Sequence, residues 1–99
     1  MRKIYFGDFQ LYVKEHIKEI QKDEIGAYTI EWFLIRYLKK ITRVTEGTKE
    51  YIHVEGPIRS LIRFYVDNID EQSELGDRCK KIHEEYRKLL REKQSSKYN

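Results

Sequence analysis

The sequence predicts an α+β fold, in which about four helices accompany a small antiparallel sheet. Apolar residues recur at helical spacing in several segments, and two β-rich runs flank a turn that contains glycine. The last segment carries the strongest pattern, because its apolar residues are spaced to lie on one stripe of a long amphipathic helix. This stripe consists of Leu75, Cys79, Ile82, Tyr86 and Leu89.

The first half of the chain is expected to begin with a strand and to continue with two helices. Residues 3–6 are typical of a short strand, which ends at Gly7. A first amphipathic helix is expected over 9–23 and a second over 27–41. Because apolar residues cover more than one face of the second helix, we expect it to be the most buried.

A hairpin is expected in the middle of the chain. Residues 42–45 and 50–54 are rich in β-forming side chains, and the turn between them contains Gly47. This hairpin, together with the N-terminal strand, would form the small antiparallel sheet. Pro57 suits the first turn of a helix and is expected to open the third one.

The last helix is predicted to be long and to end the domain. Gly76 costs about 1 kcal/mol relative to alanine inside a helix, which favours a helix start after it. The chain contains no linker, so we expect a single domain over 1–93 and a frayed tail over 94–99.

The apolar stripe of the last helix needs a covering surface, and two alternatives are open. The stripe packs against the third helix, or it meets its own copy across a two-fold axis. Two heptads are too short for a free-standing coiled coil, so a copy would need further contacts. Because a small charged protein gains stability by dimerising, we predict a homodimer.

The composition is that of a highly charged globular domain. The chain combines 20 basic with 17 acidic residues, and its net charge of +3 argues only weakly for an anionic partner. Its one cysteine, Cys79, excludes an intrachain disulfide and is expected in the core. The start of the chain lacks a signal-peptide pattern, and no uncharged run is long enough to span a membrane. We therefore expect a cytoplasmic protein without membrane contact.

No motif for catalysis or cofactor binding is assembled in the sequence. His16, His53 and His83 fall in three different predicted elements, and there is no glycine-rich phosphate loop. An acidic series straddles the start of the last helix, where carboxylates are expected for capping and dipole reasons: Asp67, Asp70, Glu71, Glu74 and Asp77. We expect neither an enzyme nor a bound metal or cofactor.

Two helices followed by a hairpin form the element order of a winged helix, which binds DNA. Lys49 would lie at the tip of the wing. Three features argue against this interpretation. The second helix is rich in bulky apolar side chains, and it offers only Thr29 and Arg36, with no Asn, Gln or Ser, to read base edges. The wing also carries acidic residues. Cations at a helix end are also favoured by the helix dipole alone. The candidate DNA contacts are Arg36, Lys39, Lys40 and Arg43.

The composition also resembles that of a group of viral proteins. There is one alanine (Ala27), two asparagines (Asn68 and Asn99), one methionine and one cysteine, against abundant Ile, Tyr, Lys, Arg and Glu. In this and in length, the chain resembles the small orphan proteins of crenarchaeal viruses from hot acidic springs, the lipothrixviruses and rudiviruses. No family motif supports the resemblance, so it assigns no residue a role. It implies an accessory protein of the infected cell, often a compact homodimer, sometimes a DNA-binding regulator or an inhibitor of host defence.

Taken together, these patterns predict a non-enzymatic, dimeric, virus-encoded protein that acts by binding a protein partner. Exposed Tyr and Arg side chains are enriched at binding hot spots, which makes Tyr12, Tyr51, Arg59 and Arg63 the expected contacts. The alternative is a winged-helix-like DNA-binding regulator.

Overall fold

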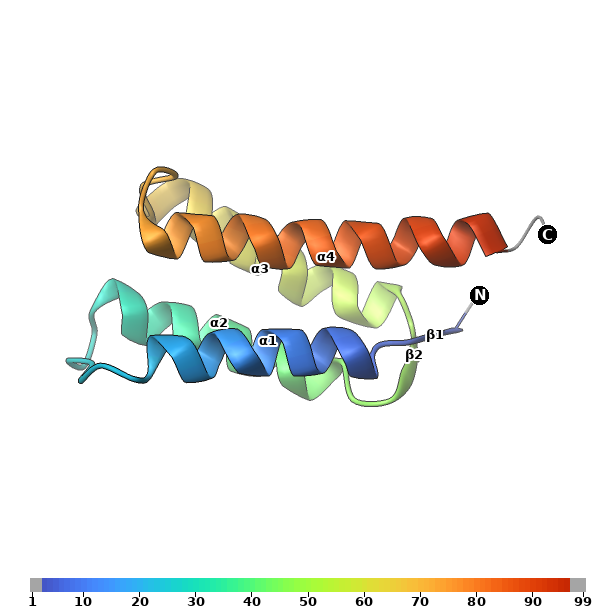
Figure 1. Ribbon diagram of the computed structural model, residues 1–99, viewed down its shortest axis with the longest axis horizontal. Coiled ribbons are helices and arrows are strands. Elements are labelled where there is room, and N and C mark those ends of the chain that lie inside the picture. The colour runs from blue at the N-terminus through green and yellow to red at the C-terminus, as the bar shows by residue number, and fades with distance from the viewer. Residues whose placement is uncertain (1–2, 97–99) are drawn as a thin grey trace.

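Four helices and two short strands follow one another over residues 3–96, the part of the chain that the computed structural model describes (Figure 1). The α+β class and the long last helix are confirmed. The order is β1 (Lys3–Tyr5), α1 (Gly7–Ile20), α2 (Ile30–Val44), β2 (Thr48–Glu50), α3 (Ile52–Asn68) and α4 (Glu74–Ser96).

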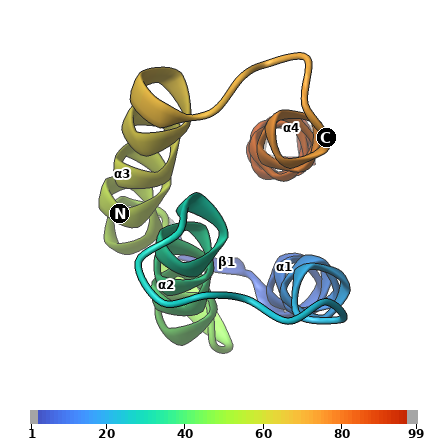
Figure 2. The ribbon, with the colours of Figure 1, turned by 90° about the vertical axis from the view of Figure 1, so that its left-hand side faces the viewer.

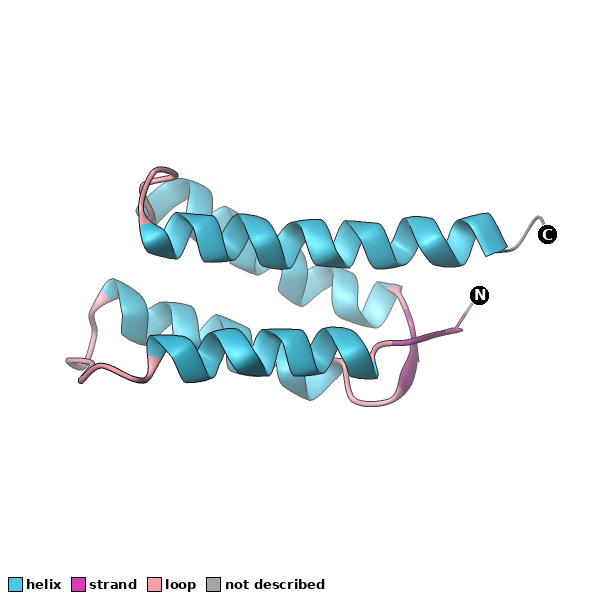
Figure 3. Cartoon of the chain, in the orientation of Figure 1, coloured by secondary structure: helices cyan, strands magenta, loops and turns pink. Residues whose placement is uncertain are grey.

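The helices occupy the four corners of a bundle (Figure 2). Helix α2 lies beside α1 and α3, and α4 closes the bundle against the same two helices. The strands lie at one end of the bundle, whereas the loops that connect α1 with α2 and α3 with α4 lie at the other (Figure 3).

The core runs along the axis of the bundle, because each helix turns one apolar stripe inward. Helix α2 contributes Leu34, Leu38 and Ile41, none of which has solvent-accessible surface. Val13 of α1 and Leu61 of α3 are equally enclosed. Helix α2 buries one face, while its opposite side remains on the surface. The prediction that it is the most buried helix is therefore wrong, because it has four buried residues and α1 has five.

The apolar stripe of α4 packs within its own chain. Cys79, Ile82 and Tyr86 are buried, and Leu75 and Leu89 pack against the same core. Two contacts fix its position. The Tyr86 ring lies 5.8 Å from that of Phe9 in α1, and its hydroxyl donates a hydrogen bond to the Glu55 carboxylate in α3. Of the two alternatives, the structure shows packing in cis, so the stripe is not a free surface for a second copy.

The expected hairpin does not form, which is a correction to the sequence prediction. Residues 42–44 belong to the last turn of α2, and the hydroxyl of the buried Thr45 donates to the Ile41 carbonyl at 2.7 Å. Strand β2 pairs instead with β1 in antiparallel register, with Ile4 opposite Lys49. Burial of Ile41 and Thr45 holds this β-rich segment in the helix, a tertiary effect that overrides propensity.

Helix α3 begins at Ile52 rather than near Pro57, so the second expected strand is also wrong. The proline lies inside the helix, where it lacks one donor of the i to i−4 series. The turn before the proline contains Val54, which is buried, and Glu55, which contacts Tyr86. Both interactions favour the helical conformation there.

Helix α4 begins at Glu74 and includes Gly76, contrary to the expected later start. The glycine is buried against the loop before the helix, and a Cβ at this position would overlap the Asp70 carbonyl and lie 2.9 Å from the Cα of Glu71. The close approach of the two backbone segments explains why glycine occupies position 76. The helix also includes the backbone of 94–96, part of the expected tail, whereas 97–99 lie outside the described residues.

The two helical glycines give opposite predictions. Gly76→Ala should lower the free energy of unfolding by about 1–3 kcal/mol, because the added methyl forces two backbones apart. Gly56→Ala in α3 should raise it by about 0.5–1 kcal/mol, since the new Cβ meets nothing within 4 Å and alanine favours the helix. Denaturant unfolding followed by circular dichroism measures both. Stabilisation by both substitutions would contradict the close approach at Gly76.

Candidate functional site

The outward side of α2 carries the four cations that the sequence singled out. Arg36, Lys39, Lys40 and Arg43 are all exposed. Helical periodicity places these positions opposite the buried face of α2, so the side chains share one solvent-facing ridge. None of them takes part in the ion pairs formed among the described residues. The structure thus groups four unpaired positive charges.

Helix α1 adds two lysines at the edge that faces α2. Gln10 marks this edge, because its side-chain amide donates to the Thr42 carbonyl of α2 at 2.7 Å. Gln21, directly after the end of α1, lies on the same edge, because it lines a hollow together with residues of α2. Lys14 and Lys18 are exposed and lie between these two positions along the same side of the helix. We call the six residues the cationic face: Lys14, Lys18, Arg36, Lys39, Lys40 and Arg43.

Two acidic side chains of α1 lie on its other flank, towards α4. Asp8 lines a hollow with residues of α4, and Glu19 lines another with Arg78. The four ion pairs among the described residues lie at the end of α1 and within α3 and α4, and none lies in α2. Asp23 and Glu24 of the loop after α1 are the carboxylates that line a hollow together with Arg36 and Lys39.

Two connected hollows follow the cationic face. One, of about 420 Å³, is lined by Arg36, Lys39, Thr42 and Arg43. The other, of about 630 Å³, shares Arg36 and Lys39 and extends to the loop after α1. The remaining lining of the larger hollow is mixed in character and comprises Gln21, Asp23, Glu24, Ile25, Trp32 and Ile35.

Three aromatic side chains gather beside these cations at the start of α2. The ring centroids of Tyr28 and Trp32 lie 4.9 Å apart, and those of Trp32 and Phe33 are at the same separation. The Arg36 guanidinium lies over the indole, 5.0 Å from its centroid. We call Tyr28, Trp32 and Phe33 the aromatic cluster. The sequence suggested that Trp32 and Phe33 are core residues, but both reach the surface, and Tyr28 was not singled out at all.

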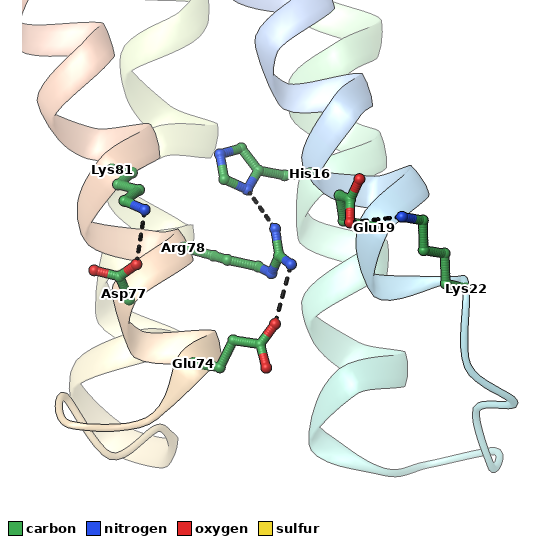
Figure 4. A network of polar contacts seen from close by, with 7 residues as sticks. All are labelled: His16, Glu19, Lys22, Glu74, Asp77, Arg78 and Lys81. Carbon is green, nitrogen blue, oxygen red and sulfur yellow. Dashed lines mark hydrogen bonds and ion pairs between the residues drawn. The ribbon is translucent and has the colours of Figure 1, made fainter.

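A polar network joins α1 to α4 on another side of the bundle (Figure 4). The Arg78 guanidinium donates to Nδ1 of His16 and to the Glu74 carboxylate, each at 3.1 Å. Because a guanidinium only donates, Nδ1 of His16 is unprotonated in this contact. Burial, and then the positive charge of Arg78, lower the pKa of His16.

The acidic series at the start of α4 has local structural roles. Asp77 pairs with Lys81 at 3.0 Å, and the Asp70 carboxylate accepts from the Gln72 amide at 2.9 Å. Within the described residues, no three His, Cys, Asp or Glu side chains are placed to hold a metal ion. Cys79 is fully enclosed, and burial raises its pKa to about 11.

The residues expected to contact a protein partner do not share one surface feature. Tyr12 is half-buried against the core and packs edge-on against His16. Arg59 pairs with Glu55, while Tyr51 and Arg63 are exposed on α3 or directly before it. Lys49, expected at a wing tip, lies in β2.

Comparisons with known proteins identify no relative: no family model, no curated protein and no solved structure matches the chain. In the described part of the chain, no helix combines the length and apolar character needed to cross a membrane.

The contact of His16 with Arg78 predicts a loss of stability in mild acid. Because folding lowers the pKa of His16, the unfolded chain takes up a proton at a higher pH than the folded chain does. The free energy of unfolding should therefore fall as the pH drops below about 6.5, and level off below the pKa of the folded state. His16→Gln should reduce this fall, whereas His53→Gln, at an exposed site, should not. A His16 pKa above 6.5 in an NMR titration would contradict the prediction.

Proposed function

We propose that the protein acts by binding nucleic acid through its cationic face, without catalysing a reaction. The observation that carries the proposal is the grouping of unpaired cations on α2 and the adjoining edge of α1, in a chain with nearly as many acidic as basic residues. Within the described residues, the ion pairs involve only Lys22, Arg59, Arg78 and Lys81, so the cations of α2 have no ionic partner in the described part of the chain. A segregated positive face is typical of a surface that attracts a polyanion.

The chemistry of the face suits phosphate groups. Arg36 and Arg43 can each present a planar pair of donors to phosphate oxygens, and lysines add mobile point charges. Thr42 also lines the hollow of about 420 Å³ between these side chains, and its hydroxyl donates to the Lys39 carbonyl at 2.7 Å. Without the expected wing, the contact would be made by the ridge of α2 and the lysines of α1 alone.

Binding should therefore depend strongly on salt. Labelled random-sequence DNA, as single strand and as duplex, should bind at low salt and dissociate as salt rises, because phosphate contacts release counterions. Fluorescence anisotropy measures the affinity at each salt concentration. Lys39→Gln with Lys40→Gln should weaken binding and flatten the plot of log K against log salt by about 1.5 in slope.

A matched control uses two exposed lysines of α4. Lys80→Gln with Lys88→Gln changes the net charge by the same amount on another part of the bundle. Its affinity should stay close to that of the unmodified protein. Equal losses in both double variants would mean that net charge alone attracts DNA, and no binding at low salt would overturn the proposal.

A second candidate function, binding of a protein partner or of a second copy, is favoured by the aromatic cluster. Tyr, Trp and Arg dominate binding hot spots, and Tyr28, Trp32 and Arg36 contact one another at the surface. A virus-encoded accessory protein in the host cytoplasm, which the composition suggests, could occupy a host protein in this way.

Self-association is the testable form of this candidate. A homodimer should sediment with twice the chain mass of 12.1 kDa at micromolar concentration. Phe33→Ser should shift the equilibrium towards monomer if the aromatic cluster lies in the interface, since the Phe33 ring is 38% exposed. Sedimentation velocity on both proteins measures the effect, and a strictly monomeric unmodified protein would remove the homodimer.

A further inference from the structure

The aromatic cluster combines exposure with a fixed arrangement. Tyr28 is 76% exposed, yet its ring contacts both Trp32, at 4.9 Å, and Phe33, at 6.4 Å. Phe33 in turn lies 6.4 Å from Phe64 of α3, so the cluster is anchored to the bundle. Large apolar side chains held on the surface in contact with one another are typical of binding sites.

The backbone before α2 holds Tyr28 in this position. Its φ is +65°, a left-handed conformation that costs a non-glycine residue about 1 kcal/mol. Thr29 fixes the turn from both sides, because its hydroxyl donates to the Gly26 carbonyl at 2.8 Å and accepts from the Trp32 amide at 3.3 Å. An unusual backbone conformation thus places an exposed ring against the only tryptophan of the chain.

The cationic face continues directly from the cluster. Arg36 lies over the Trp32 ring, and the ridge runs on through Lys39 and Lys40 to Arg43. From position 32 to position 43 the helix rises about 16 Å, the length of about five stacked nucleotides. Rings at one end of a row of cations are the arrangement by which proteins bind single strands, stacking bases and pairing phosphates.

The two hollows differ in chemistry, and each suits a different part of a nucleotide. The hollow of about 420 Å³ is lined by three cations and Thr42, and its positive charge suits phosphate. The larger one has the Trp32 ring and Ile35 beside Gln21, and also the carboxylates of Asp23 and Glu24. Carboxylates repel phosphate but accept hydrogen bonds from the N–H groups of bases, so this hollow suits a neutral base.

We propose that the protein binds single-stranded nucleic acid, with a base stacked on the exposed ring of Tyr28, which contacts Trp32, and phosphates along Arg36, Lys39, Lys40 and Arg43. The inference rests on the proposed nucleic-acid binding and specifies its substrate class. A duplex keeps its bases stacked inside, where rings beside the backbone cannot reach them. The sequence of α2 also contains no Asn, Gln or Ser to read base edges in a groove.

Trp32 makes the proposal directly measurable, because the chain has no second tryptophan whose fluorescence would interfere. Oligothymidylate of about 15 nucleotides is titrated at low salt against an abasic oligomer and a duplex of equal length. The single strand should quench Trp32 and bind at least about fivefold more tightly than the abasic oligomer, the effect of stacking one base. Equal binding of single strand, abasic oligomer and duplex, or preference for the duplex, would overturn the single-strand inference while leaving the proposed function standing. Failure of all three to bind would overturn both.

A matched pair of variants tests the stacking residue. Tyr28→Phe keeps the ring and should retain the preference for the single strand over the abasic oligomer. Tyr28→Asn removes the ring but tolerates the left-handed backbone, so the fold is kept, and the preference should fall at least about threefold. Binding of the abasic oligomer should be equal in both variants. An unchanged preference in Tyr28→Asn would contradict stacking on Tyr28.

Discussion

Helix α2 occupies a corner of the bundle, and the burial of its inner face constrains the rest of the structure. Leu34, Leu38 and Ile41 fill the axis between the other helices, so no charged residue can occupy that side of α2. The cations of this helix must then share the remaining arc. In a chain whose charged residues make up 37% of the total, such packing gathers the cations of α2 on one exposed side of the helix.

The packing of the helices also explains why the apolar stripe of α4 does not form a binding surface. Its apolar stripe is the most regular pattern in the chain, but α1 and α3 cover it completely around Ile82. The Glu55 carboxylate that accepts from Tyr86 also pairs with Arg59, so the contact between α3 and α4 has a polar component at its edge. The stripe is therefore not a binding surface, and the cationic face lies away from it, on α2 and the adjoining edge of α1.

The aromatic cluster departs from what stability alone would favour. Tyr28 exposes most of its ring and adopts a backbone conformation that asparagine or glycine would adopt at lower cost. Local conflicts of this kind are expected at functional sites, where binding compensates for what folding loses. The half-buried contact between His16 and Arg78, by contrast, joins α1 to α4. Within the described residues, no buried side-chain polar atom lacks a hydrogen-bond partner.

Sequence periodicity alone determined the fold class, the approximate positions of the helices and the apolar stripe of α4. The spacing of apolar residues predicts which face of a helix is buried. It also identified the cations of α2. Only the tertiary structure decided that residues 42–44 are helical, that β2 pairs with β1, and that Gly76 lies within α4. These outcomes depend on contacts between segments distant in sequence, such as the approach of the Asp70 backbone to Gly76, which local propensity cannot register. The contact between Tyr28 and Trp32 likewise needs a left-handed backbone at Tyr28. The sequence does not predict this conformation, because tyrosine stands where glycine would be expected.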